Sequence, residues 1–187
     1  MRHFTETSNI MRVIEHKFKN HQIKADTETL IIGTFNPNSP NNPADFFYGR
    51  NRNNFWKLLP IAFDNEILND KTKIDKIAFS NKFKVDFIDL INSVEVEEGQ
   101  ETNYDDNYID SRVIEWNKII PTLSNLKTIK KICFTRKTLS DIPHMKEKIL
   151  EIENYCKSQN IIFTYLLTPA RFYNSKKQEV WNNFFKQ

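Results

Sequence analysis

The sequence has 187 residues, of which 39% are hydrophobic and 13% aromatic, a composition that fits one globular domain with a complete hydrophobic core. Its formal net charge is only +3, but seven acids between residues 93 and 110 leave +10 on the rest of the chain, which is compatible with binding a polyanion on one face. With only three glycines, a glycine-rich phosphate loop is not expected, and two cysteines are too few for a four-ligand zinc or iron–sulfur site. The sequence has no secretory signal and no apolar run of about 18 residues, which argues against secretion and against a membrane span.

Periodic apolar residues predict helices and strands that alternate along the chain. The first segment, residues 1–28, carries Ile10, Met11, Ile14 and Phe18 at helical spacing, which predicts an amphipathic helical extension ahead of the first strand. Four short runs rich in β-branched and aromatic residues predict strands at 29–33, 85–91, 128–135 and 161–167. Helical patterns follow at 54–63, 108–120, 142–157 and 176–185, and Pro60 is expected to kink or shorten the first of them.

This alternation predicts the fold class. Strands that alternate with helices favour right-handed crossovers and a mostly parallel sheet covered on both faces. No internal repeat or Gly/Ser linker interrupts the sequence, so we predict a single domain over residues 1–187. The predicted architecture is α/β, with three α/β/α layers around a central four-stranded parallel sheet. Ligands of such folds bind beyond the carboxyl ends of the strands, which directs attention to the loops after Gly33, Ile91, Thr135 and Leu167.

The loop after the first predicted strand has the most unusual composition. Residues 36–54 contain seven asparagines and three prolines, which suits a stiff structural loop. An ordered loop of this length beside a strand end is, however, more often functional. It also carries an exposed-looking aromatic triplet at 46–48, then Arg50 and Arg52, and ends at a helix start, so it offers groups that stack on bases and groups that meet phosphates.

The string from IIGTFNPN to DFFYGRNRNNFWKLL resembles the first motif region of the uracil-DNA glycosylase superfamily, and within it the hypoxanthine-DNA glycosylase branch. That branch has a Gly-Ser/Thr turn, then Tyr-Tyr-Gly, four residues, Asn, any residue and Phe-Trp. The matching positions are Phe47, Tyr48, Gly49, Asn53, Phe55 and Trp56. Residues 85–91 with Asp89, 132–135 and 166–174 resemble later family segments in the same order, so the resemblance spans roughly residues 29–187.

The resemblance implies that an asparagine amide holds the attacking water. Asn53 is the better-matched motif position and is our first choice. Asn36, followed by Pro37, resembles the mismatch-specific uracil-DNA glycosylase branch, in which that asparagine orients the water. The turn from Gly33 to Pro37 carries one residue more than either branch, so both asparagines stay candidates. The alternative for each is a loop-capping asparagine.

The resemblance also implies contacts to DNA. The candidate base-binding residues are Gly33, Phe35, Phe47 and Tyr48, and the candidate DNA-binding residues are Arg50, Arg52, Thr168, Arg171 and Phe172. Thr168 stands where relatives usually have Ser or His and keeps a hydroxyl. Arg171 and Phe172 are expected to enter the minor groove, the aromatic ring filling the gap left by an extruded base. A strand stopped by Pro169 with a surface arginine is the alternative.

Other ionisable residues are assigned structural roles. The four histidines are scattered without metal spacing, and we expect surface or capping positions for them. Asp86 and Asp89 are three apart on a predicted strand and point to opposite faces, and a structural role is favoured for Asp89. Lys57 is expected on the solvent side of its helix, which argues against a lysine Schiff base.

The function implied is a monofunctional, cofactor-free DNA glycosylase that removes hypoxanthine or uracil. The oxocarbenium-like sugar accepts water readily, so a neutral asparagine that orients the water suffices. We expect a cytoplasmic monomer that binds DNA containing damaged or mismatched bases and no membrane. The alternatives are a non-catalytic nucleic-acid-binding module that keeps the fold, and a hydrolase of small nucleosides or nucleotides.

Overall fold

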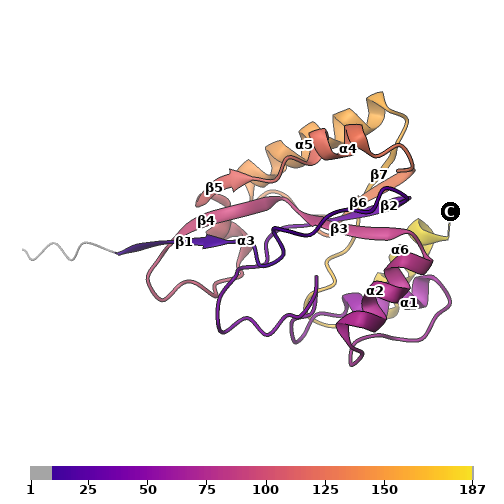
Figure 1. The fold of residues 1–187 in the computed structure, drawn as a ribbon, viewed down its shortest axis with the longest axis horizontal. Helices are drawn as coiled ribbons and strands as arrows, with labels where there is room; N and C mark the ends of the chain where they lie inside the picture. The colour runs from indigo at the N-terminus through magenta and orange to yellow at the C-terminus, as the bar shows by residue number, and fades with distance from the viewer. Residues whose placement is uncertain (1–9, 187) are drawn as a thin grey trace, which may run out of the picture.

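A computed structural model describes residues 10–186 and has three α/β/α layers (Figure 1). Its centre is a four-stranded parallel sheet with the strand order β3-β2-β6-β7. The strands are β2 (Thr29–Gly33), β3 (Val85–Asp89), β6 (Lys131–Phe134) and β7 (Ile162–Tyr165). All four lie within or at the predicted strands, so the parallel sheet of the prediction is confirmed.

Helices cover both faces of the parallel sheet (Figure 1). One face carries α1 (Phe55–Ala62), α2 (Lys73–Lys82) and α6 (Ser175–Phe185), and the other carries α4 (Ile119–Asn125) and α5 (Pro143–Ser158). Side chains of β2 alternate between the two faces. Leu30 and Ile32 pack with Met145 and Ile149 of α5, whereas Ile31 packs with the aromatic residues of α1.

Pro60 lies inside α1, which ends two residues later at Ala62. Proline has no backbone N–H and cannot donate to the carbonyl four residues earlier, which belongs to Trp56. The backbone N–H of Leu68 donates to that carbonyl at 2.7 Å instead. The helix is therefore short, as predicted, and its free carbonyl is satisfied by the loop that follows.

A second, antiparallel sheet with the order β1-β4-β5 corrects two helix predictions. Its strands are β1 (Met11–Glu15), β4 (Ile91–Glu97) and β5 (Val113–Trp116), and α3 (Asp106–Asp110) lies between the last two. The helix predicted within residues 1–28 is wrong, because Met11 to Glu15 pair with Glu97 to Ser93 of β4. Residues 1–9 of that prediction lie outside the described part. The helix predicted at 108–120 is wrong as well, since strand pairing overrides its helical period.

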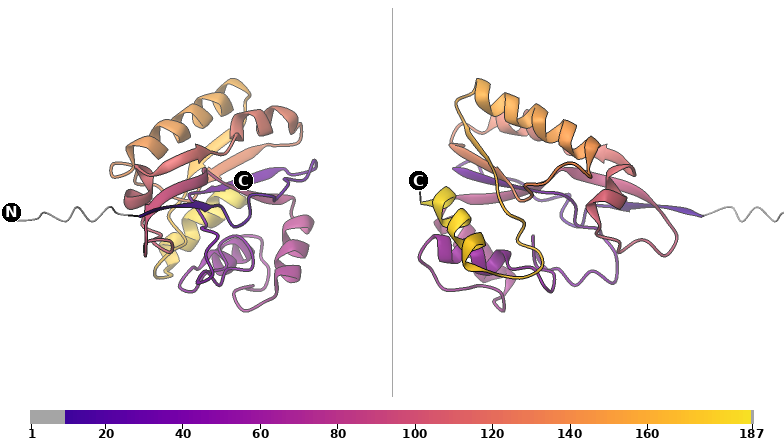
Figure 2. Two further views of the ribbon diagram at one scale, coloured as in Figure 1. Left: turned by 60° about the vertical axis from the view of Figure 1, so that its left-hand side comes forward. Right: turned by 180° about the vertical axis from the view of Figure 1, so that it is seen from behind.

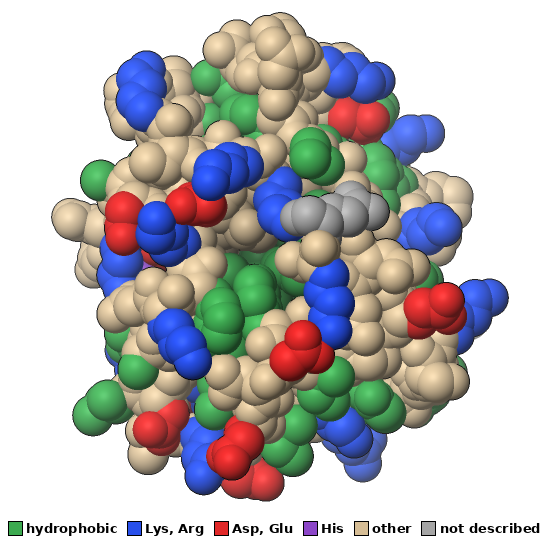
Figure 3. Space-filling view, turned by 90° about the vertical axis from the view of Figure 1, so that its right-hand side faces the viewer, with side chains coloured by type: hydrophobic (Ala, Val, Ile, Leu, Met, Phe, Trp, Pro, Cys, Tyr) green, Lys and Arg blue, Asp and Glu red, His purple; other side chains and the backbone are tan. Residues whose placement is uncertain are grey.

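The chain topology sets where a ligand site is expected. From β2 the chain passes to β3 at one edge and later returns to β6 on the other side of β2, so the strand order reverses around β2. Crevices form at such points beyond the carboxyl ends of the strands. The carboxyl ends of the parallel strands lie toward the antiparallel sheet (Figures 1 and 2). At the opposite end of the molecule, near the C-terminus, lysine and arginine side chains surround an apolar hollow (Figure 3).

None of the helices among residues 10–186 is long and apolar enough to span a membrane.

Candidate active site

A cavity of about 80 Å³ lies beyond the carboxyl ends of all four parallel strands. The loop after β2, the ends of β3 and β6 and the loop after β7 each contribute to it. Its lining residues are Thr34, Phe35, Asn36, Tyr48, Arg50, Asn53, Asp89, Thr135, Thr168, Pro169 and Ala170. Six of the residues proposed from the sequence, together with Asp89, therefore meet around one space.

The first and last loops are joined into one wall of this cavity. Asn53 forms an isolated antiparallel bridge with Ala170. The backbone N–H of Asn54 donates to the Pro169 carbonyl at 2.9 Å, and its side-chain Nδ2 donates to the Arg171 carbonyl at 2.7 Å. Residues more than 110 positions apart in the sequence are thus held side by side, and the asparagine-rich loop supplies the donors.

Asn53 stands directly before α1. Its Oδ1 accepts a hydrogen bond from the backbone N–H of Phe55 at 2.9 Å, which fixes the side chain at the helix start. An amide oxygen has two lone pairs, so one remains for a second donor such as water. The side chain is half-buried and lines the cavity. This arrangement leaves Asn53 able to hold a water molecule.

Asn36 is more deeply buried, at 4% exposure. Its Oδ1 accepts from Nδ2 of Asn42, which also donates to the Pro37 carbonyl at 2.7 Å. The backbone carbonyl of Asn36 accepts from the N–H of Lys17 at 2.7 Å. Asn36 lines the cavity too, and its amide oxygen accepts from one protein donor, as that of Asn53 does. The deeper burial of Asn36 is what separates the two residues and makes Asn53 the first choice.

Gly33 permits the closest contact in the site. A Cβ on this residue would lie 2.2 Å from Oδ1 of Asp89 and 2.8 Å from the hydroxyl oxygen of Tyr48. Both distances are shorter than van der Waals contact, so any other residue at this position would displace the carboxylate and the hydroxyl. Gly33 itself is not among the residues that line the cavity, although Asp89 and Tyr48, which it contacts, are.

Asp89 is held by a buried histidine. Nε2 of His16 lies 2.7 Å from Oδ2 of Asp89, and the two side chains are 2% and 7% exposed. The backbone N–H of Phe18 donates to Nδ1 of His16 at 3.0 Å, so Nδ1 carries no proton and Nε2–H is the donor to the carboxylate. The expectation of a surface or capping role is wrong for His16.

Tyr48 connects the aromatic core to the cavity. Its ring stacks on Phe55 at 3.9 Å and 6°, and its hydroxyl lies 3.0 Å from Oγ1 of Thr135. Burial and the neighbouring Asp89 carboxylate hold the pKa of Tyr48 well above its usual range, so it remains a neutral phenol. Its backbone is left-handed, with φ 57°, as are Arg52 and Arg171 in the two loops, a form of strain that tends to occur at functional sites.

Tyr104, just before α3, and Asp106, at the start of α3, lie next to the site. The Arg50 guanidinium lies 3.7 Å from the ring centroid of Tyr104, so this arginine is engaged by the protein itself. Asp106 is paired with Arg136 at 2.5 Å. Burial raises the pKa of Asp106, against the opposing effects of Arg136 and Thr34. The acidic segment seen in the sequence thus lies against one side of the cavity.

Some predicted site residues lie elsewhere. The exposure expected for the aromatic triplet is wrong, since Phe46 and Phe47 are 4% and 3% exposed and pack in the core. Phe47 does not line the cavity, so the structure gives it no contact with a base bound there. Arg52 and Arg171 are exposed beside the cavity, and Phe172 is 72% exposed on the last loop.

Sequence reasoning missed several residues of the site. Thr34 follows the predicted strand 29–33 and Thr135 ends the predicted strand 128–135, and these positions were the signal for them. His16 and Tyr104 gave no local signal, because their partners are 73 and 54 residues away in the sequence.

Lys57 is half-buried with its ammonium over the Tyr173 ring at 3.9 Å and does not line the cavity. Among residues 10–186, no three His, Cys, Asp or Glu side chains are grouped closely enough to hold a metal ion.

A solved structure has the same fold. No protein-family model matches the sequence, and no curated protein matches it. The solution structure of a protein from Methanosarcina acetivorans, proposed to be a uracil DNA glycosylase, matches with a TM-score of 0.58 and 18% identity over 88% of this chain and 92% of that one. The predicted uracil-DNA glycosylase-like fold, with its four-stranded parallel sheet between helices, is confirmed.

Proposed function

We propose that the protein is a DNA glycosylase of the uracil-DNA glycosylase superfamily that hydrolyses the N-glycosidic bond of hypoxanthine or uracil. The observation that carries this proposal is the meeting of Asn53, Asn36 and Asp89 in one cavity at the carboxyl ends of the parallel strands. The likeness of the fold to a protein proposed to be a uracil DNA glycosylase supports it. The motif that runs from Phe47 to Trp56 is the sequence support.

In the proposed reaction the free lone pair of Asn53 Oδ1 aims a water molecule at the sugar carbon as the base departs. Orientation is the main contribution, because an oxocarbenium-like sugar reacts readily with water. The Asp89 carboxylate, which lines the cavity, stabilises the positive charge of the sugar. The neutral Tyr48 hydroxyl and Thr135 offer hydrogen bonds near the leaving base, and Phe35 gives an apolar contact.

The described cavity is small. Its volume of about 80 Å³ accommodates a few water molecules but is well below that of ordinary ligand pockets. An extruded base therefore enters only when a wall moves, and the Tyr104 contact with Arg50 is the one we expect to open. Release from Tyr104 would free Arg50 for a phosphate, beside the exposed Arg52, Arg171 and Phe172 on the DNA-facing loops.

Three alanine variants test the site. Asn53→Ala should lose base release from uracil- or hypoxanthine-containing duplexes while still binding DNA, because the water loses its acceptor. Asn36→Ala should weaken activity less and lower stability, since its oxygen accepts within the loop network. Asn51→Ala, at an exposed loop position, is the matched control. Full activity in Asn53→Ala and loss of activity in Asn36→Ala would reassign the water to Asn36.

A further inference from the structure

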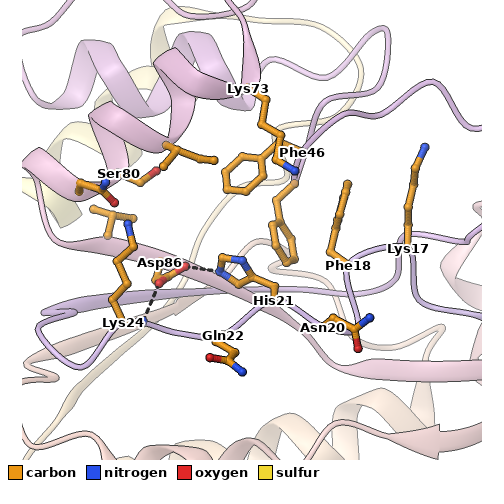
Figure 4. Close-up of a pocket in the computed structure, with 14 residues that line it drawn as sticks. Lys17, Phe18, Asn20, His21, Gln22, Lys24, Phe46, Lys73, Ser80 and Asp86 are labelled. Atoms are coloured by element: carbon orange, nitrogen blue, oxygen red, sulfur yellow. Dashed lines mark hydrogen bonds and ion pairs between the residues drawn. The ribbon is translucent and has the colours of Figure 1, made fainter.

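A second and larger cavity, of about 460 Å³, lies on the outer edge of β3 between residues 17–24 and α2 (Figure 4). No residue lines both this cavity and the one that contains Asn53. Its volume falls in the range of small-molecule sites. The proposed glycosylase reaction gives it no role.

The charge of the cavity is positive. Lys17, Lys24 and Lys73 line it from two different segments. Lys24 and Lys73 are exposed, and no carboxylate within residues 10–186 forms an ion pair with either of them. Lys17 donates from Nζ to the Asn42 carbonyl at 2.5 Å. Three ammonium groups at the rim of one pocket favour an anionic ligand.

Asp86, the acid in the lining, has its oxygens satisfied by protein donors. His21 Nε2 lies 2.6 Å from Oδ1 of Asp86, and the backbone N–H groups of Phe87 and Lys24 donate to its oxygens at 2.9 and 3.0 Å. Figure 4 shows this pair at the floor of the pocket, with Lys24 and Lys73 on different sides of it. These donors engage both carboxylate oxygens, and the three lysines of the lining outnumber its one carboxylate.

The remaining surface of the cavity is apolar and aromatic. Half-buried Phe18 and Ile77 line the cavity together with the buried residues Phe46, Phe47 and Val85. The Phe18 ring packs on Phe47 at 4.9 Å, which fixes its orientation. A planar ring that enters a cavity with this lining gains both apolar burial and aromatic contact.

We propose that this cavity binds a nucleotide. Its base would contact the apolar lining that includes Phe18 and Ile77, and its phosphate would be held by Lys24 and Lys73. The pocket combines an apolar and aromatic lining with two lysines that form no ion pair among residues 10–186, which matches an aromatic base joined to an anion. The same chemistry is present in a free nucleotide and in one nucleotide of a single strand. The proposal is independent of the glycosylase activity.

The test is calorimetric titration of the full chain with deoxyadenosine monophosphate at low salt. Deoxyadenosine and 2-deoxyribose 5-phosphate, which lack the phosphate and the base, should each bind at least about tenfold more weakly. The double variant Lys24→Glu, Lys73→Glu should also lose at least about tenfold in affinity. The double variant Lys127→Glu, Lys146→Glu matches its net charge on exposed residues of another face and should bind normally.

The results distinguish a free nucleotide from a single strand as the ligand, and this cavity from the candidate active site. Asn53→Ala should leave nucleotide affinity unchanged, since Asn53 does not line this cavity. A short oligothymidine that binds through the same lysines more tightly than the mononucleotide would identify a strand as the occupant, and weaker binding would identify a free nucleotide. Absent binding, equal binding of 2-deoxyribose 5-phosphate, or an unaffected lysine variant would each overturn the proposal.

Discussion

His16 donates from Nε2 to Oδ2 of Asp89 at 2.7 Å, and the pair joins the segment after β1 to the end of β3 beside the candidate site. Replacing His16 by Leu leaves a buried carboxylate without its donor, so the free energy of unfolding should fall by about 3 kcal/mol. Urea denaturation measures this. His16→Gln, which retains an N–H donor, should recover part of the loss. A fall below about 1 kcal/mol in His16→Leu would show that the pair contributes little.

Gly33→Ala should remove activity by displacing the Asp89 carboxylate and the Tyr48 hydroxyl, and should lower stability by about 1–3 kcal/mol. Gly99→Ala is the matched control. No atom lies within 4 Å of its added Cβ, its φ of 85° costs about 1 kcal/mol of strain, and it does not line the cavity. Base release and thermal unfolding should be measured on both. An active Gly33→Ala enzyme would mean that the contact is not required.

Asn54→Ala should loosen the last loop without removing a water ligand. The variant loses the hydrogen bond from Nδ2 to the Arg171 carbonyl, which is worth about 1 kcal/mol. Hydrogen exchange of residues 168–172 should become faster, while exchange in β7 stays unchanged. Equal exchange in the variant and the wild type would show that other contacts, such as Lys177 Nζ to the Phe172 carbonyl at 2.8 Å, hold the loop alone.

Both cysteines should resist alkylation in the folded protein. Cys133 and Cys156 are fully buried, and burial raises the pKa of Cys156 to about 11 and that of Cys133 further. The reactive thiolate is the form that a raised pKa suppresses, so at pH 8 little of it is present. Mass spectrometry after iodoacetamide treatment should find no label until denaturant is added. Rapid native labelling of Cys133 would contradict its position in the core.

Much of the central layer was predictable because its signals are local. The run 29–33 is a strand buried along its whole length, and the stripe from Ile142 to Cys156 coincides with the buried face of α5. The antiparallel sheet was not predictable in this way. Met11, Val13 and Ile14 carry no clear period of two, and their strand exists because β4 lies beside them to supply partners.

The candidate site was also predictable only where its residues have a local signal in the sequence. Asn53, Asn36 and Thr168 belong to loops at the carboxyl ends of strands, where topology indicates a site before any contact is known. His16 and Tyr104 meet Asp89 and Arg50 through long-range packing that no sequence spacing encodes. Phe47 was misplaced because an aromatic residue in a polar loop resembles an exposed one, although its ring stacks on Phe87 in the core at 5.5 Å.

The central claim is most directly tested by incubating the purified protein with labelled duplexes that contain uracil, hypoxanthine or no lesion, and measuring free base by chromatography and abasic sites by alkali cleavage. The account predicts release of uracil or hypoxanthine, with strand breaks only after alkali, and release lost in Asn53→Ala. DNA that is bound but releases neither base would contradict it.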